Sequence, residues 1–230
     1  MNALAVDCAV SRISVAAKKD TDEAKITLDL GARQSEKLLP AIDFVMKESG
    51  LSPAELDYTA VTLGPGTFTG LRIGLSSLKA LNLSHGTALY GIPSLQAYAW
   101  PYRAAAESVL CVIEAKEDEY FFQFFMHGAP LGEAEDGTLE AIVRRIDAEA
   151  PLLVCGPGAA DFCAGAATAA PLLSLRSFTP ENDAADSLFA IAEQMIAAKQ
   201  APLQDYDGPL YIRKSEAELA HEKAEAAAKK

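Results

Sequence analysis

The sequence predicts an α/β protein with two lobes, each built on a mixed sheet whose later strands are joined by helices. Three observations support this prediction. Short segments near the N-terminus alternate apolar and polar residues and are rich in β-branched residues, as strands are. Longer segments with helical spacing then alternate with further short apolar strands. A shorter version of the same order begins after residue 100. The chain has 230 residues, half of them hydrophobic, which is enough for one large domain or two small ones.

The first lobe, residues 1–100, is predicted from the order of its segments. We expect strands and helices in a βββαβαβ order: strands at 3–8, 12–17 and 25–30, a helix at 34–49, a strand at 58–63, a helix at 69–84 and a strand at 87–90. Ser35 is suited to cap the first helix and Gly50 to end it. Three successive strands can pair as an antiparallel meander, whereas the later ones need helical crossovers and lie parallel to their neighbours. This is the layout of one half of an actin-like ATPase, the ASKHA or RNase H-like fold.

The second lobe, residues 101–213, is predicted as a reduced copy of the first. Its expected elements are fewer: strands at 108–114, 120–126 and 152–155, and helices at 139–150 and 184–198. Residues 214–230 are mostly Glu, Lys and Ala, and we expect a solvated charged tail without chemistry.

Charge and hydropathy limit the partners of the chain. It carries 20 Lys and Arg against 32 Asp and Glu, a net charge of −12, so most of its surface repels a phosphate backbone. Any role with RNA is therefore expected to be indirect. No apolar run approaches the roughly 18 to 20 residues of a membrane span, and no basic stretch precedes an apolar one at the N-terminus. We expect a cytoplasmic protein without a membrane partner.

The cysteines and histidines do not form a metal-site pattern. The four cysteines include no C-x-x-C pair, and three of them lie in or beside apolar runs, so buried free thiols are expected: Cys8, Cys111, Cys155 and Cys163. Two histidines four residues apart on a helix can share one metal ion. None of the three histidines has another at that spacing: His85, His127 and His221. We expect no metal bound by this chain.

A glycine-rich stretch, GPGTFTGLRIG at 64–74, follows a predicted strand and opens a predicted helix. Its glycines permit a tight turn, Pro65 stiffens that turn, and Thr67 or Thr69 can cap the helix. Gly70 and Gly74 share one helix face and allow another element to approach closely. Glycines before a helix N-terminus also suit an anion. The stretch lacks the Lys-Ser/Thr ending of a P-loop and is not G-x-G-x-x-G, so phosphate binding is the weaker alternative.

Both helices of the first lobe carry more apolar residues than one sheet face needs. On the first helix one stripe is formed by Leu38, Ala41, Ile42 and Val45, and further apolar residues lie off it: Leu39, Phe44 and Met46. On the second helix the stripe is Leu71, Leu75 and Leu78, and the residues on other sides are Ile73, Ala80 and Leu81. Either the helix pair is deeply buried within the domain, or a second apolar face is offered to a partner. A polar rim for such a face is available in four residues: Glu36, Arg72, Lys79 and Asn82. Arg72 could instead pair with an internal carboxylate.

Several motifs together resemble one family. GPGTFTGLRIG is similar to the GPGSFTGLRIG signature of the TsaB family, with Thr67 in place of Ser. QSEKLLPAI at 34–42 resembles HSExLLPxI, with Gln34 in place of His, and GIPSLQAYA at 91–99 resembles G(V/I)SSLxALA. ALAVDCAV near the N-terminus resembles ILAIDTSx, and GPLYIR at 208–213 resembles xPxYxR. The resemblance runs from about residue 3 to 213 and is strongest up to residue 99.

The resemblance implies a non-catalytic subunit of the complex that makes threonylcarbamoyladenosine (t6A) in tRNA. It implies a heterodimer with the catalytic paralogue TsaD, formed through the two helices of the first lobe, with the ATPase TsaE as third member. TsaD would carry the metal, the nucleotide and the chemistry, and this chain alone would bind no cofactor. The isolated chain could form a homodimer. The expected interface residues are Glu36, Leu38, Leu39, Ile42, Met46, Arg72, Leu75, Leu78, Lys79 and Asn82. The expected signature loop is Gly64, Pro65, Gly66, Thr67, Phe68, Thr69 and Gly70.

The positions that would bind nucleotide in an ATPase of this fold are altered. Such ATPases place an Asp at the end of the first strand and a Gly-rich hairpin after it. Asp7 is present, but residues 8–11, CAVS, contain no glycine, and side chains obstruct close backbone approach. Asp7 is therefore a structural residue or a vestigial nucleotide site. Gly156-Pro157-Gly158 is either a nucleotide loop or an ordinary turn, and Glu114 stands where the family often has Asp.

Two functions of different classes remain open. The first is the assembly subunit, and the alternative is a small actin-fold ATPase or transferase that acts alone. The missing hairpin glycines and the scattered histidines disfavour the alternative. A peptidase has no support, because the sequence holds neither H-E-x-x-H nor His-x-x-x-His.

Overall fold

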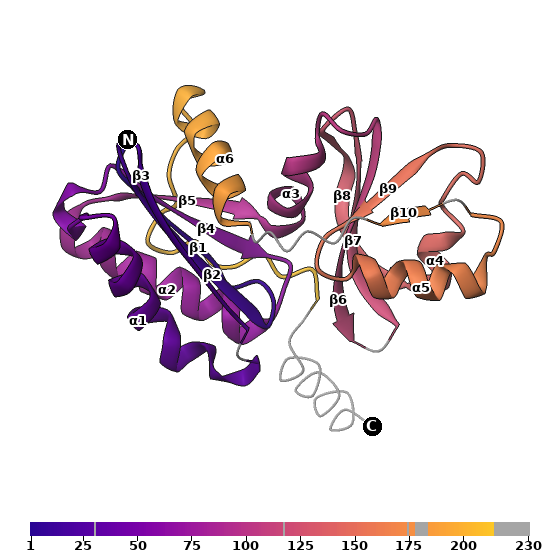
Figure 1. Cartoon of the computed structure of the whole chain (residues 1–230), viewed down its shortest axis with the longest axis horizontal. Helices are drawn as coiled ribbons and strands as arrows, with labels where there is room; N and C mark the ends of the chain where they lie inside the picture. The colour runs from indigo at the N-terminus through magenta and orange to yellow at the C-terminus, as the bar shows by residue number, and fades with distance from the viewer. Residues whose placement is uncertain (30, 117, 174, 178–183, 214–230) are drawn as a thin grey trace, which may run out of the picture.

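The computed structural model describes the chain except for residues 30, 117, 174, 178–183 and 214–230, so the predicted charged tail lies outside the described residues. Two five-stranded sheets lie side by side, each covered by helices (Figure 1). Among the described residues, no helix combines the length and the apolar content of a membrane span.

The first sheet has the strand order β3-β2-β1-β4-β5. Its strands are β1 (Ala3–Asp7), β2 (Arg12–Lys19), β3 (Asp22–Asp29), β4 (Tyr58–Gly64) and β5 (Ala88–Pro93). β1 and β2, and β2 and β3, pair antiparallel, whereas β1 with β4 and β4 with β5 pair parallel. The predicted meander followed by two crossovers is confirmed.

Helices cover both faces of this sheet. α1 (Gln34–Glu48) and α2 (Phe68–His85) pack on the face that includes Leu4 and Val6. α6 (Ala185–Ala197) contacts β1, β2, β4 and β5 from the opposite face, because alternate strand residues point to opposite sides. α6 comes from the second half of the sequence but belongs in space to the first sheet, so the division at residue 100 misplaces it. Two short 3₁₀ turns, η1 (Gly31–Arg33) and η2 (Pro53–Glu55), flank α1.

The second sheet repeats the topology of the first, with the order β10-β9-β6-β7-β8. Its strands are β6 (Ser108–Lys116), β7 (Glu119–Met126), β8 (Ala129–Thr138), β9 (Leu152–Cys155) and β10 (Leu175–Ser177). The first three pair antiparallel, and β9 and β10 are added in parallel. Each of the five strands of the first sheet therefore has a counterpart in the second sheet. The reduction lies in element length, since β10 has three residues and α4 (Leu139–Val143) has five.

The helix predicted at 139–150 is wrong beyond Val143. The chain continues in tight turns, with Arg145 N donating to Ile142 O, and the Asp147 carboxylate then accepts from Glu149 N. Such a local side-chain bond competes with helix continuation. Two α-helices and two strands were not predicted: α3 (Ser94–Ala99), α5 (Ala159–Ala169), β8 and β10.

One apolar cluster joins the two lobes. It combines Ile92 and Leu95 of the first lobe with Val109 and Phe125 of the second, and Leu188 of α6. α3 lies between the lobes, as Figure 1 shows, and contacts strands of both sheets; the 3₁₀ turn η3 (Trp100–Tyr102) follows it. The lobes are therefore in direct apolar contact.

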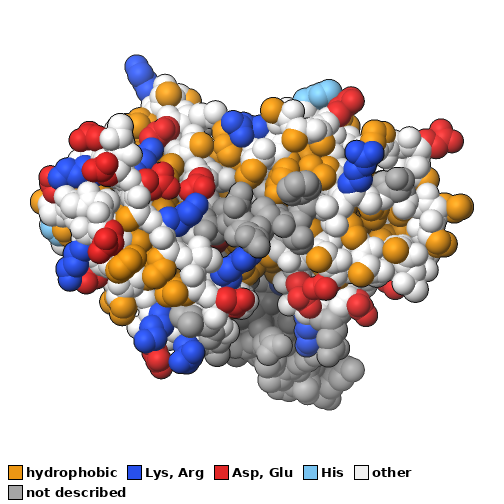
Figure 2. All heavy atoms as spheres, in the orientation of Figure 1, with side chains coloured by type: hydrophobic (Ala, Val, Ile, Leu, Met, Phe, Trp, Pro, Cys, Tyr) orange, Lys and Arg blue, Asp and Glu red, His pale blue; other side chains and the backbone are white. Residues whose placement is uncertain are grey.

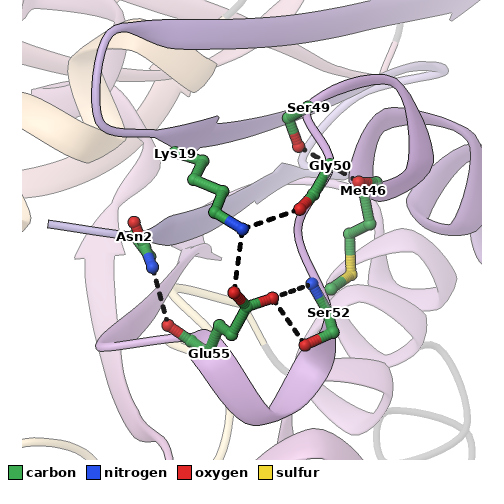
Figure 3. A network of polar contacts seen from close by, with 7 residues as sticks. All are labelled: Asn2, Lys19, Met46, Ser49, Gly50, Ser52 and Glu55. Atoms are coloured by element: carbon green, nitrogen blue, oxygen red, sulfur yellow. Dashed lines mark hydrogen bonds and ion pairs between the residues drawn. The ribbon is translucent and has the colours of Figure 1, made fainter.

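A polar network fastens the C-terminal end of α1 (Figure 3). The Ser49 hydroxyl donates to carbonyls of the last helical turn, and Gly50 follows with a φ of 62°. Lys19 Nζ of β2 lies 2.9 Å from Gly50 O and 2.8 Å from Glu55 Oε1. Glu55 also accepts from the Ser52 amide at 2.9 Å and the Ser52 hydroxyl at 2.7 Å. The hydrogen bonds from Lys19 and Ser52 lower the pKa of Glu55 to about 2.

Candidate partner-binding face and glycine loop

The outer side of α1 and α2 carries large apolar side chains in water. Leu39 and Phe44 of α1 are 63% and 46% exposed, and Leu83 of α2 is 73% exposed. We call these three residues the outer helical face. Figure 2 shows hydrophobic side chains gathered over this helix pair, with Lys, Arg, Asp and Glu around them. Where large exposed apolar side chains form a patch they mark a site of protein contact, so this helix pair is the candidate surface.

The structure changes the composition of the predicted interface. Five of the ten predicted residues are buried between the two helices and the first sheet, so their side chains are not accessible to a partner: Leu38, Ile42, Met46, Leu75 and Leu78. Their apolar stripe is used for packing within the chain. Of the ten, Glu36, Leu39 and Arg72 are exposed. That this surface binds a partner stays a prediction, now with Phe44 and Leu83 in it.

Three residues predicted as a polar rim bind other parts of the chain. Arg72 Nε donates to the Tyr211 hydroxyl at 2.8 Å, and its guanidinium carbon lies 3.7 Å from the centre of the Phe68 ring. Lys79 Nζ donates to backbone carbonyls of the segment after α6, and the Asn82 amide donates to Thr87 O. The alternative partner predicted for Arg72, an internal carboxylate, is replaced by a phenol and a ring.

The glycines of the signature loop each accommodate a second backbone. A Cβ at Gly66 would lie 2.3 Å from Ala9 O, and one at Gly70 would lie 2.2 Å from Cys8 O. Thr67 N donates to the same Ala9 carbonyl at 2.7 Å. The loop therefore rests on the β1–β2 hairpin, at the place where an ATPase of this fold would need room for phosphates. This favours a packing role for the loop over phosphate binding.

The remaining loop residues have separate positions. Pro65 is buried, Thr69 is exposed, and Thr67 stands at the N-cap of α2 without a side-chain capping bond. The Phe68 ring is stacked on the Tyr211 ring with centroids 5.1 Å apart. Gly64 has a φ of 123°, and a Cβ there would lie 2.4 Å from Leu210 O.

Asp7 is held inside the first lobe. The residue is 2% exposed. Its carboxylate accepts hydrogen bonds from Thr62 Oγ1 at 3.0 Å, from Tyr98 OH at 2.7 Å and from Ala9 N at 3.0 Å. Burial and the Asp7 charge raise the pKa of Tyr98, so its hydroxyl keeps the proton it donates. Both carboxylate oxygens are thus engaged by protein donors, which supports the structural interpretation of Asp7. Burial also raises the pKa of the Cys8 thiol, which stays protonated and a poor nucleophile.

The second lobe repeats the glycine turn after its fourth strand. Gly158 N donates to Val112 O at 3.1 Å, and a Cβ at Gly156 would lie 2.5 Å from the same oxygen. A Cβ at Gly158 would lie 2.9 Å from Glu114 N. Gly156-Pro157-Gly158 thus packs on β6 as the first-lobe loop packs on the β1–β2 hairpin, which favours the ordinary turn. Within the described part of the chain, no three His, Cys, Asp or Glu side chains are placed to share a metal ion.

The fold is an α/β fold of the actin-like class. Its structural neighbours include YeaZ from Pseudomonas aeruginosa, with a TM-score of 0.74 and 22% identity over 91% of this chain and 99% of that one. A second Pseudomonas aeruginosa structure, of a protein with similarity to peptidase YeaZ, gives a TM-score of 0.75. The family model described as "TsaD: tRNA N6-adenosine threonylcarbamoyltransferase" matches residues 30–127.

The chain is similar to proteins of the TsaB/YeaZ family, as its motifs predicted. It is 29% identical to the tRNA threonylcarbamoyladenosine biosynthesis protein TsaB of Escherichia coli, over 61% of this chain and 63% of that protein. The Haemophilus influenzae TsaB is 31% identical over 52% of this chain and 51% of its own length. A tRNA N6-adenosine threonylcarbamoyltransferase of Erythrobacter litoralis is 40% identical over 78 residues, or 34% of this chain and 23% of the enzyme.

Proposed function

We propose that this chain is the non-catalytic subunit of the t6A synthesis complex. It binds and supports the catalytic subunit TsaD, with TsaE, while threonylcarbamoyl is transferred to the adenosine 3′ of the anticodon. The relation to proteins named for t6A biosynthesis supports the pathway. The complex works in the cytoplasm, and the chain meets tRNA indirectly, because its net charge of −12 opposes a phosphate backbone.

The outer helical face is the observation that supports TsaD as the partner. Leu39, Phe44 and Leu83 are exposed on two helices that both lie within residues 30–127, the segment related to TsaD. Two related helix pairs can pack about a pseudo-two-fold axis and cover the apolar side chains of both. The same surface would let the isolated chain pair with a second copy of itself.

The absence of chemistry in this chain is proposed on three observations. The sequence has no His-x-x-x-His pair. The Asp7 carboxylate is engaged by Thr62 and Tyr98. The space beside the glycines of the signature loop is filled by neighbouring backbone. We therefore assign ATP and metal to the partner subunits and none to this chain alone.

Reconstitution of t6A formation tests the proposal. TsaD and TsaE from the same organism are mixed with tRNA, threonine, bicarbonate, ATP and the adenylate-forming enzyme, with and without this chain. We expect t6A to accumulate only with the chain present, and no ATP hydrolysis by the chain alone. Equal t6A formation without the chain would contradict the proposal. Turnover of ATP by the chain alone would favour the alternative of an ATPase or transferase that acts by itself.

A further inference from the structure

The segment from Leu203 to Arg213 crosses from the first lobe towards the second (Figure 1), and we call it the C-terminal strap. Two backbone hydrogen bonds seat it on the first sheet. Leu203 N donates to Leu89 O of β5 at 2.8 Å, and Leu210 N donates to Leu63 O of β4 at 2.8 Å. The strap therefore starts as an addition to the first lobe.

Two glycines make room for the strap. A Cβ at Gly64 would lie 2.4 Å from Leu210 O. A Cβ at Gly91 would lie 2.3 Å from Leu63 Cδ1 of β4 and 2.9 Å from Leu203 Cδ1 of the strap, so this glycine makes room for both. Real Cβ atoms do not approach backbone oxygens this closely, so a side chain at Gly64 would displace the strap. One glycine of the family signature thus serves the strap, while Gly66 and Gly70 serve the β1–β2 hairpin.

Side chains of α2 hold the middle of the strap. The Lys79 ammonium donates to three of its carbonyl oxygens, at 3.1, 2.6 and 2.6 Å: Gln204, Asp205 and Asp207. About two turns earlier on α2 Arg72 holds Tyr211 through the hydrogen bond, and about three turns earlier Phe68 holds it through the ring stack. The strap thus runs along α2, in the direction opposite to the helix.

The last residue of the strap contacts the second lobe. The Arg213 guanidinium pairs with Glu119 of β7 at 2.7 Å and with Asp136 of β8, and it lies 5.5 Å from the centre of the Phe121 ring. Its side chain is 30% exposed, so the two ion pairs are partly shielded from water. Charge-assisted bonds of a guanidinium to two carboxylates constrain its position strongly.

The strap also divides the space between the signature loop and the second sheet. One cavity, of about 250 Å³, lies beside Phe68 and Phe121, and another, of about 420 Å³, lies beside Gln96 and Gln123. Residues 210–212 line both cavities. The strap therefore stands where a single larger opening between the lobes would otherwise lie.

We infer that the C-terminal strap locks the two lobes in one arrangement, with Arg213 as its latch on the second lobe. The strap opposes movement of the lobes about the apolar cluster that joins them and keeps the space between them divided. The chain is then a rigid support whose lobes do not open and close. This inference does not depend on binding to TsaD, so the two can fail separately.

Hydrogen exchange on the full chain tests the latch. Arg213→Ala is compared with Arg145→Ala, a matched control that loses a two-bond ion pair with Glu135 inside the second lobe. We expect Arg213→Ala to raise the exchange rate of the Leu210 amide by about tenfold or more, because its local opening becomes easier. Arg145→Ala should leave this amide unchanged. Arg213→Lys, which keeps the charge but loses the forked geometry, should fall between them.

Small-angle X-ray scattering of the same variants tests the lock. We expect a broader distribution of interatomic distances for Arg213→Ala than for the wild type and for Arg145→Ala, which should agree with each other. An unchanged exchange rate of the Leu210 amide in Arg213→Ala would show that Arg213 does not hold the strap in place. A rise in exchange spread evenly over both lobes, or an unchanged distance distribution in Arg213→Ala, would overturn the lock.

Discussion

At the residue scale, the family signature is explained by contacts of backbone with backbone. Gly66 and Gly70 face the carbonyls of Ala9 and Cys8, and Gly64 faces that of Leu210. The sequence predicted a tight turn and a close approach at these glycines. It could not show what approaches, because the hairpin lies more than fifty residues away and the strap more than one hundred and forty. Neither partner leaves a local signal in the pattern of the loop.

Gly66→Ala tests this explanation. The added Cβ would lie 2.3 Å from Ala9 O, so the hairpin and the loop must separate. We expect the free energy of unfolding to fall by about 1 to 3 kcal/mol, the usual cost of overpacking. Gly208→Ala is the control, because no atom lies within 4 Å of a Cβ there. Thermal unfolding curves in which both variants match the wild type would contradict the explanation.

Two buried hydroxyls near Asp7 should respond in opposite ways to removal. Ser14 is 1% exposed, and within the described part of the chain its Oγ makes no hydrogen bond. Thr62 Oγ1 donates to Asp7 and accepts from Cys8 N. We expect Ser14→Ala to keep or raise the melting temperature, and Thr62→Val to lower stability by about 1 to 3 kcal/mol, the cost of unpaired buried groups. Calorimetry showing equal losses for both would refute this assignment.

At the scale of the element, α1 and α2 show how far periodicity can predict a surface. Their inner stripes were predicted correctly and are buried, as Leu38 and Leu78 show. The outer surface was harder to predict, since Met46 lies off the stripe by spacing but is buried, whereas Phe44 is exposed. A helix that leans on its sheet at an angle buries flanking residues unequally, and that angle follows from the tertiary structure.

The network at the end of α1 predicts a pH dependence. The pKa of Glu55 is lowered from 4.5 to about 2, so its ionised form is favoured by folding. Its contribution is complete above about pH 4.5 and is lost as the pH falls towards about 2. The melting-temperature difference between wild type and Glu55→Gln should therefore be constant between about pH 5 and about pH 7, and it should shrink below about pH 4.5.

Glu48→Gln, on the exposed side of α1, is the control for that measurement. Its difference from the wild type should not shrink in the same way over the same range. A Glu55→Gln difference that stayed constant down to about pH 3 would show that the network does not act through the Glu55 charge.

At the scale of the whole molecule, the two lobes were unequally predictable. Most elements of the first lobe follow from strong alternation and from helices of clear period, although the short helix α3 does not. In the second lobe, β8 is an edge strand with mostly exposed residues, and α5 is rich in Ala, so neither has a strong pattern. The return of α6 to the first sheet and the course of the strap depend on long-range packing, which no local pattern records.

In the proposed complex, the whole molecule binds TsaD through the outer helical face. Leu83 is 73% exposed, so Leu83→Glu should leave the fold intact while placing a charge on the outer helical face. Burying an unpaired charge in an interface is costly, and we expect the affinity for TsaD to fall by about tenfold or more. Leu172→Glu is the matched control, since Leu172 is 90% exposed in the second lobe.

The most direct measurement is light scattering after size-exclusion chromatography of this chain mixed with TsaD from the same organism. We predict a heterodimer for the wild type and for Leu172→Glu, and its loss or marked weakening for Leu83→Glu with an unchanged melting temperature. A heterodimer that forms equally well with Leu83→Glu, or a wild type that does not bind TsaD, would contradict the account.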